Sequence, residues 1–345
     1  MTTYALRLAL AAGALSMAVA GTVAADPAEP TVAEPVTTNT PPGTTDNFDV
    51  YYNVCRGTDP RCYRPWVADR ENKVLLYTRT AGPRHANISP ALGPGLDPPL
   101  GAAANQNVAQ KAIKAWLEAV GVEVHWTEDV NTLASQLGPG SEYKAVIFLS
   151  NSRDALWKHG TAVNPARAVD TSTSAHLDAG KTALRQYIRS GGGFVGIHNA
   201  FGTEYNWPWY EGLLGNANYY NHGRFQDGDI ETVAKSDSST NGLPARWAFR
   251  DEWYNLEPFP TNVKFLLTVD ETSLATLSDE HPGHGSFHPI AWCQYYDGGR
   301  SWVTTLGHDA QAFTDGSDFP SQAQFKQFIV NGILSAMGNV PFCTN

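Results

Sequence analysis

Short apolar runs alternate with segments of helical periodicity from residue 73 onward, and this alternation constrains the fold more than any other feature. The strand candidates are residues 74–77, 122–126, 145–149 and 194–197. Helical patterns cover residues 105–120, which end at Gly121, and the stretch before Gly191, for which Ser174 is the expected N-cap. Strands that alternate with helices form parallel sheets covered on both faces. The sequence therefore predicts an α/β fold.

The pattern changes beyond residue 200. We expect aromatic loops first, then strands at residues 263–269, 290–296 and 301–305, and then a closing helix. The apolar residues of this helix recur at helical spacing and predict a stripe that faces the core: Phe325, Phe328, Ile329, Ile333 and Met337. The prediction is one domain over residues 50–345, with its core at 72–338.

The N-terminus has the features of a secretory signal. Arg7 precedes an apolar run over residues 8–21, and Val23-Ala24-Ala25 fits a signal peptidase site. Residues 26–49 are rich in Pro and Thr and are expected to form a disordered tether. We therefore expect cleavage after residue 25 and a secreted or extracytoplasmic protein that has no membrane partner after cleavage.

Charge and cysteine content narrow the function further. The chain has 24 Lys and Arg against 34 Asp and Glu, a net charge of -10, so we expect no nucleic-acid partner. In an oxidising compartment the four cysteines favour the disulfides Cys55–Cys62 and Cys293–Cys343. No Cys-x-x-Cys motif is present, which argues against a cysteine zinc site.

Three predicted strands are followed by histidines, and ligands bind at the carboxyl ends of the strands in open parallel sheets. His85 follows the first strand, His198 lies in Gly196-Ile197-His198-Asn199-Ala200, and His308 follows the last strand. Gly-x-X-x-small after a strand has the form of a nucleophile elbow. Because histidine replaces the Ser or Cys of such elbows, the pattern indicates proton transfer or metal ligation rather than a Ser or Cys triad.

Five motifs occur in the order seen in ThuA-like (trehalose utilisation) domains, which the chain resembles over about residues 72–338. They are Gly191 to His198, Trp209 to Gly215 followed by His222, Asp251 to Tyr254, His288 to Trp292, and Gly299 to His308. The resemblance implies a flavodoxin-like sheet similar to class I glutamine amidotransferases, without the elbow cysteine, and an association with sugar utilisation. It also matches His85, His198, His222 and His308 to family histidines.

The candidate catalytic residues are His198, His308, Glu252 and His222, and the candidate substrate-binding residues are His85, Asn199, Trp209, Tyr210, Asp251 and Trp292. Adjacent residues of an extended chain point to opposite faces, so only one of Asp251 and Glu252 lines a pocket; alternation leaves open which one. The aromatic side chains could stack on the faces of a sugar, although about half of them are expected in the core. Glu204 is a further candidate acid, expected at the surface.

A metal site is the remaining chemical candidate. His198, His222 and His308, with one carboxylate, would suit a divalent metal such as zinc and leave one position open. His281, His284 and His288 form a weaker candidate in a glycine-flanked loop.

Two functions are therefore expected from the sequence. The first is an enzyme, a hydrolase, lyase or isomerase, that acts on a sugar or oxidised sugar without a cysteine nucleophile. The alternative is a non-catalytic extracellular carbohydrate-binding module. An amidotransferase-type hydrolase is disfavoured because no cysteine lies at the elbow.

Overall fold

The computed structural model describes residues 47–67, 69–90, 100–157 and 179–344. The expected signal peptide, residues 26–46 of the tether and the expected N-cap Ser174 lie outside these residues. Strand β1 (Phe48–Asp49) pairs with β2 (Val54–Gly57), so the last two residues of the predicted tether belong to a strand. No helix in the described part of the chain is long and apolar enough to cross a membrane.

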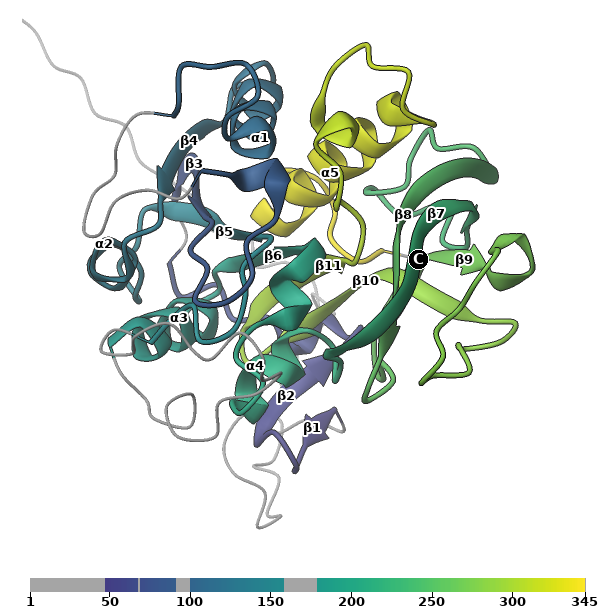
Figure 1. Cartoon of the computed structure of the whole chain (residues 1–345). Helices are drawn as coiled ribbons and strands as arrows, with labels where there is room; N and C mark the ends of the chain where they lie inside the picture. Colours follow the sequence, from purple (N-terminus) through teal and green to yellow (C-terminus); the bar gives the residue numbers. More distant parts are fainter. Residues whose placement is uncertain (1–46, 68, 91–99, 158–178, 345) are drawn as a thin grey trace, which may run out of the picture. The chain divides into compact units, whose positions relative to one another are not determined.

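One half of the central sheet is parallel, as predicted (Figure 1). Its strands occur in the order β4 (Glu123–Thr127), β3 (Glu71–Tyr77), β5 (Tyr143–Leu149), β6 (Gly193–Ile197) and β11 (Gly299–Thr304). β5 and β6 are buried along nearly their whole length. A strand buried on both faces is a continuous apolar run, which explains why the sequence pattern located this half.

Helices cover both faces of the parallel half, as predicted. The helices are α1 (Val108–Glu118), α2 (Val130–Gln136), α3 (Ala179–Arg189), α4 (Pro208–Leu213) and α5 (Gln322–Met337). On β3, Val74 and Leu76 share a buried cluster with α1 and α5, whereas Leu75 and Tyr77 share another with α2, α3 and α4. Alternate side chains of each strand therefore anchor opposite helix layers.

The other half of the sheet is antiparallel. It confirms the strands expected at residues 263–269 and 290–296, whereas residues 219–232 and 246–256 form strands where aromatic loops were expected. It continues from β11 through β10 (His288–Tyr296), β9 (Lys264–Asp270), β7 (Tyr219–Thr232) and β8 (Arg246–Leu256). β7 is largely half-exposed or exposed and rich in polar residues, so it lacks the apolar run of a buried strand. β7 pairs with β8 along nearly its whole length, and this pairing satisfies the backbone hydrogen bonds of β7. The composition of β7 alone therefore does not predict a strand.

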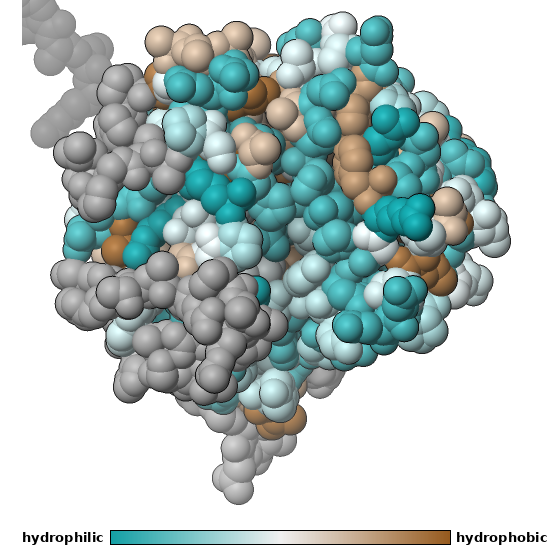
Figure 2. Space-filling view, in the orientation of Figure 1, coloured by the Kyte–Doolittle hydropathy of each residue, from teal (hydrophilic) through white to brown (hydrophobic). Residues whose placement is uncertain are grey.

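Short 3-10 helices and two disulfides complete the described structure. The 3-10 helices are η1 (Pro60–Cys62), η2 (Ala86–Ile88), η3 (His198–Gly202), η4 (Glu271–Ser273) and η5 (Ala310–Phe313). The disulfides join Cys55 to Cys62 and Cys293 to Cys343, the pairing expected from the sequence. They account for all four cysteines of the chain. The face shown in Figure 2 is mostly hydrophilic, with small, separate apolar areas.

Candidate active site

Three histidines meet at the carboxyl edge of the parallel strands. His85 follows β3, His198 follows β6, and His308 follows β11. The ring centroids of His85 and His198 are 4.7 Å apart, and each of these rings lies 5.3 Å from that of His308. The expectation that histidines after separate strands would converge is therefore met by the geometry.

His198 occupies a sharp turn between β6 and η3. Its φ angle is +52°, in the left-handed region that non-glycine residues rarely adopt. A Cβ at Gly196 would approach Val303 to 3.1 Å and Phe194 to 3.2 Å, so the elbow requires a small residue there. Nδ1 of His198 lies 2.9 Å from the carbonyl of Thr305, to which it can only donate. Nε2, 3.0 Å from the Tyr254 hydroxyl, is therefore the atom with a lone pair.

Glu252 reaches the same point from β8. Its Oε2 lies 3.0 Å from Nδ1 of His308 and 3.8 Å from Nε2 of His198, and its Oε1 lies 3.5 Å from Nε2 of His222. The antiparallel half of the sheet thus supplies the carboxylate to histidines held by the parallel half. We call His85, His198, Glu252 and His308 the His–Glu cluster.

Asp251 is buried beside Glu252 and is held by backbone hydrogen bonds, so its contact with substrate stays a prediction. Its carboxylate is buried and accepts hydrogen bonds from the backbone N–H groups of Gly307 at 2.7 Å, Glu252 at 2.8 Å and His308 at 3.3 Å. Burial raises the pKa of Asp251 to about 7 against the hydrogen bond from Gly307. Asp251 fixes the turn that presents His308, and the cavity lining described below does not include it.

Burial and mutual proximity shift the pKa values of the cluster. Desolvation, with the charge of His308, lowers the pKa of His85 to about 4, and desolvation lowers that of His198 well below its usual value. Desolvation acts to raise the pKa of Glu252, but His308, His222 and His85 outweigh it and lower the pKa. For His308, desolvation is outweighed by the carboxylate of Glu252, and the pKa is raised. At neutral pH two neutral imidazoles therefore face an ionised carboxylate.

The four cluster residues fit a divalent metal ion. One ligand atom from each lies within 4.8 Å of the others. Nδ1 of His85 and Nδ1 of His308 are buried, and neither makes a well-aligned hydrogen bond within the described structure. Nδ1 of His308 lies 3.0 Å from Oε2 of Glu252, within the distance of an ion pair. Imidazole nitrogens and a carboxylate oxygen are ligands typical of zinc and similar cations.

This ligand set differs from the expected one, because His85 replaces His222. His222 lies on β7 beside an irregularity in the pairing with β8, between His222 and Phe225. Its Nδ1 donates to the carbonyl of Gly223 at 2.6 Å, and its ring remains beside Glu252 without joining the four ligand atoms. His222 is therefore placed to contact a bound molecule.

A cavity of about 220 Å³ opens onto Glu252 and His85. His222 and Asn199 line the same cavity, and so do Arg153, Tyr205, Tyr219 and Tyr254. Arg153 follows β5, so the rule that identified His85, His198 and His308 would have found it if applied to that strand as well. Of the tyrosines, Tyr254 ends one of the five sequence motifs and Tyr219 lies in the aromatic run before His222, whereas Tyr205 carries no comparable signal in the sequence.

The aromatic residues expected to bind substrate do not lie in the site. The rings of Trp209, Tyr210 and Trp292 are buried in the core between the sheet and α4. Their polar atoms donate to Asp297 at 2.8 Å, to the carbonyl of Ala200 at 3.0 Å and to the carbonyl of Leu214 at 2.8 Å, respectively. Because each polar group is satisfied inside the protein, these side chains stabilise the fold.

Glu204 and the histidine-rich loop also differ from expectation. Glu204 is buried rather than exposed and lies 3.0 Å from the equally buried Lys181. In the loop, Nδ1 of His288 lies 2.7 Å from Glu271, and Nε2 of His284 accepts from the backbone of Leu256 at 3.0 Å. These nitrogens have structural partners, and among the described residues only the His–Glu cluster groups ligands suited to a metal.

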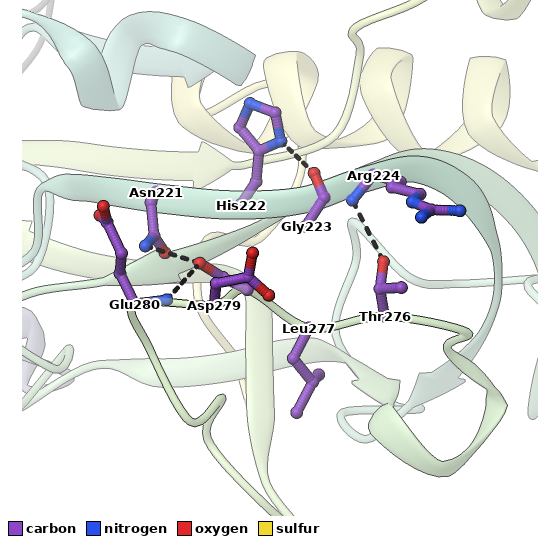
Figure 3. A pocket seen from close by; sticks show the side chains of 9 residues that line it. Asn221, His222, Gly223, Arg224, Thr276, Leu277, Asp279 and Glu280 are labelled. Carbon is purple, nitrogen blue, oxygen red and sulfur yellow. Dashed lines mark hydrogen bonds between the residues drawn. The ribbon is translucent and has the colours of Figure 1, made fainter.

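A larger cleft of about 600 Å³ lies on the far side of β7 (Figure 3). It is lined by residues 221–224 and 276–280, and Asn221 donates to Ser278 at 2.8 Å. Figure 3 shows the ring of His222 on the opposite side of β7 from Leu277, Asp279 and Glu280. The cleft contains no member of the His–Glu cluster, so it is distinct from the candidate active site.

The fold and the site define a class: α/β proteins with a half-parallel sheet, helices on both faces of that half, and a histidine directly after a central strand. Residues 73–335 match the family ThuA, described as trehalose utilisation, and the chain belongs to this family. No curated protein matches the chain.

Two solved structures described as ThuA-like are similar to the chain. A protein described as ThuA-like from Bacteroides uniformis ATCC 8492 is 20% identical with a TM-score of 0.50, over 77% of this chain and 91% of that one. A second, from Parabacteroides merdae ATCC 43184, is 17% identical with a TM-score of 0.49, over 77% and 90% of the two chains. At these identities the likeness concerns the fold alone.

Proposed function

We propose that the protein is a secreted enzyme that acts on a sugar or an oxidised sugar, with the His–Glu cluster as its catalytic centre. The observation that carries this proposal is the convergence of four ligand atoms, from four separate segments, within 4.8 Å at the edge of the sheet. Strand ends are where open α/β sheets bind their ligands. Pairs of groups with oppositely shifted pKa values, such as Glu252 and His308, are frequent in catalytic sites.

Cysteine chemistry has no support in this chain. All four cysteines are in disulfides, and the elbow position that would carry a nucleophile is His198. An imidazole and a carboxylate transfer protons or bind a metal, which suits a hydrolase, lyase or isomerase. The proposed reaction therefore uses histidine acid/base or metal-assisted chemistry.

The proposed cofactor is a divalent cation such as zinc, held by the four cluster residues. When bound, such a cation would polarise a substrate oxygen or lower the pKa of a bound water. His222 is left outside the ligand set, and its ring is 3.5 Å from Glu252 with a side chain that is 28% exposed. Its proposed role is to exchange a proton between substrate and solvent.

A small carbohydrate is the proposed partner, rather than nucleic acid or a membrane. The family is associated with trehalose utilisation. The cavity is lined by hydrogen-bonding groups, among them Asn199, Ser152 and Tyr219, which suit the hydroxyl rim of a sugar. Its volume of about 220 Å³ suits a single sugar ring better than a long glycan.

The test measures the turnover of a panel of mono- and disaccharides and their keto derivatives. NMR monitors the reaction, and zinc is added to the protein. We expect His198→Asn and His308→Asn to lower kcat/KM by at least about 100-fold. His125→Asn is the matched control, because His125 lies on β4 outside the cluster. Full activity in both cluster variants would refute the proposal. A sugar that binds but is recovered unchanged would favour the non-catalytic binding module.

A further inference from the structure

We propose that Arg153 binds a carboxylate of the substrate, so that the substrate class is a sugar acid. This inference rests on the proposed function and adds the chemical class of the ligand. It is carried by the position of Arg153 in the cavity, by the way its backbone is held, and by the charges around it.

Arg153 occupies a strand end equivalent to those of the cluster histidines. It follows β5, which lies between β3 and β6 in the sheet, and it lines the same cavity as His85, His222 and Glu252. Among the described residues that line this cavity, Arg153 provides the only guanidinium or ammonium group. A permanent positive charge therefore faces the space in which a substrate of Glu252 would lie.

The backbone of Arg153 is held in an unusual conformation. Its φ angle is +57°, and nearby Ser150 and Glu204 have φ angles of +51° and +54°. The N–H of Arg153 donates to Gly202 at 2.8 Å, and its carbonyl accepts from Ala155 at 2.8 Å and from Glu204 at 3.0 Å. Left-handed non-glycine residues that the surrounding structure holds in place are concentrated at ligand-binding sites.

A buried ion pair supports this segment from below. Glu204 and Lys181 are both buried and lie 3.0 Å apart, and Oε1 of Glu204 accepts from the backbone N–H of Leu156 at 2.7 Å. Gly82 supplies the room above, since a Cβ there would lie 2.3 Å from Cγ of Arg153. Buried contacts therefore hold the backbone of this segment, and the Arg153 side chain packs closely against Gly82.

The guanidinium is oriented by an aromatic neighbour. It lies 5.9 Å from the ring centroid of Tyr205, whose hydroxyl donates to the carbonyl of Tyr219 at 3.0 Å. Tyr205 and Tyr219 both line the cavity. A planar guanidinium can recognise a carboxylate through two parallel hydrogen bonds.

The charges of the site favour a carboxylate over a neutral or dianionic group. Arg153 provides the only guanidinium or ammonium group among the described residues that line the cavity, so it is the group that can pair with an anionic substrate. One guanidinium balances the single charge of a carboxylate, whereas a phosphate dianion would need more cations. A neutral sugar would gain little from a fixed guanidinium. A sugar ring whose carboxylate binds Arg153 is therefore the ligand that best fits the cavity.

The experiment is calorimetric titration of the mature protein with D-glucuronate, D-gluconate, D-glucose and D-glucose 6-phosphate. We expect at least one sugar acid to bind the wild type at least about 10-fold more tightly than glucose. Arg153→Gln should weaken that binding by roughly 10- to 100-fold, and Arg153→Lys should restore part of it. Arg224→Gln is the control, because it removes a positive charge from the larger cleft instead. It should leave the affinity for the sugar acid unchanged.

Each other outcome overturns the inference. Equal binding of glucose and both sugar acids by the wild type would overturn it independently of any variant, and so would tighter binding of glucose 6-phosphate. An unchanged preference in Arg153→Gln would also overturn it. If glucose binds and is converted while the acids are not, this inference fails and the proposed function stands. If no sugar binds, both fail.

Discussion

Removing the disulfide between Cys293 and Cys343 should destabilise the protein more than removing the one between Cys55 and Cys62. The first joins residues separated by 50 positions and the second residues separated by 7. If a disulfide acts by restricting the unfolded chain, these separations correspond to about 4.1 and about 2.4 kcal/mol at 25 °C. The expected difference is therefore about 1.7 kcal/mol.

The two pairs are well matched for this comparison. Each disulfide joins one fully buried cysteine to one that is 7–8% exposed, so the side-chain volume removed from the core is similar in the two cases. The variants are Cys293→Ala with Cys343→Ala, and Cys55→Ala with Cys62→Ala. The measurement is the free energy of unfolding of each variant, obtained from urea titrations that are monitored by far-UV circular dichroism. The comparison requires that the two variants have equal m-values. Equal losses in the two variants, or a larger loss for the short loop, would refute the reasoning.

Two further predictions concern packing and charge. Gly223→Ala should destabilise the fold by about 3 kcal/mol or more in thermal denaturation, because its Cβ would lie 1.8 Å from the carbonyl oxygen of Leu277. Gly140→Ala is the control and should be tolerated, because the space around Gly140 is open. Equal destabilisation by the two substitutions would contradict this reasoning. In metal-free protein, the lowered pKa of Glu252 gives stability that is lost as pH falls below its ordinary value of 4.5, and the raised pKa of His308 gives stability present below 6.5 and lost as pH rises. The free energy of unfolding of the wild type, measured in urea titrations, should therefore exceed that of Glu252→Gln most between about pH 4.5 and 6.5. A difference between the two proteins that does not change with pH would contradict the ion pair between Glu252 and His308.

The sequence was most informative where strands are buried on both faces. β5 and β6 are continuous apolar runs, so their positions and the polar residues after them could be predicted. β7 could not be recognised, because its side chains are mostly half-exposed and its stability depends on pairing with β8. Glu252 was nevertheless identified from its motif, although its strand was not predicted.

The direction of side chains was harder to predict than their position in the chain. Trp209 and Tyr210 lie between the elbow and His222 in the sequence, yet both rings point into the core, because α4 packs against the sheet. Glu204 was expected at the surface, but Lys181 from α3 provides a buried partner that no local pattern reveals. Which side chains enter a cavity depends on tertiary contacts, and local sequence patterns do not reveal these contacts.

The most direct test of the central claim is the metal content of the mature protein. Protein equilibrated with zinc and then desalted should retain about one ion per chain by inductively coupled plasma mass spectrometry. Glu252→Gln and His308→Asn should lose most of the bound zinc, because Glu252 and His308 belong to the four-ligand group. His222→Asn should retain the zinc, because His222 does not belong to this group. Wild-type protein without zinc, or zinc that persists in both cluster variants, would contradict the assignment of this site.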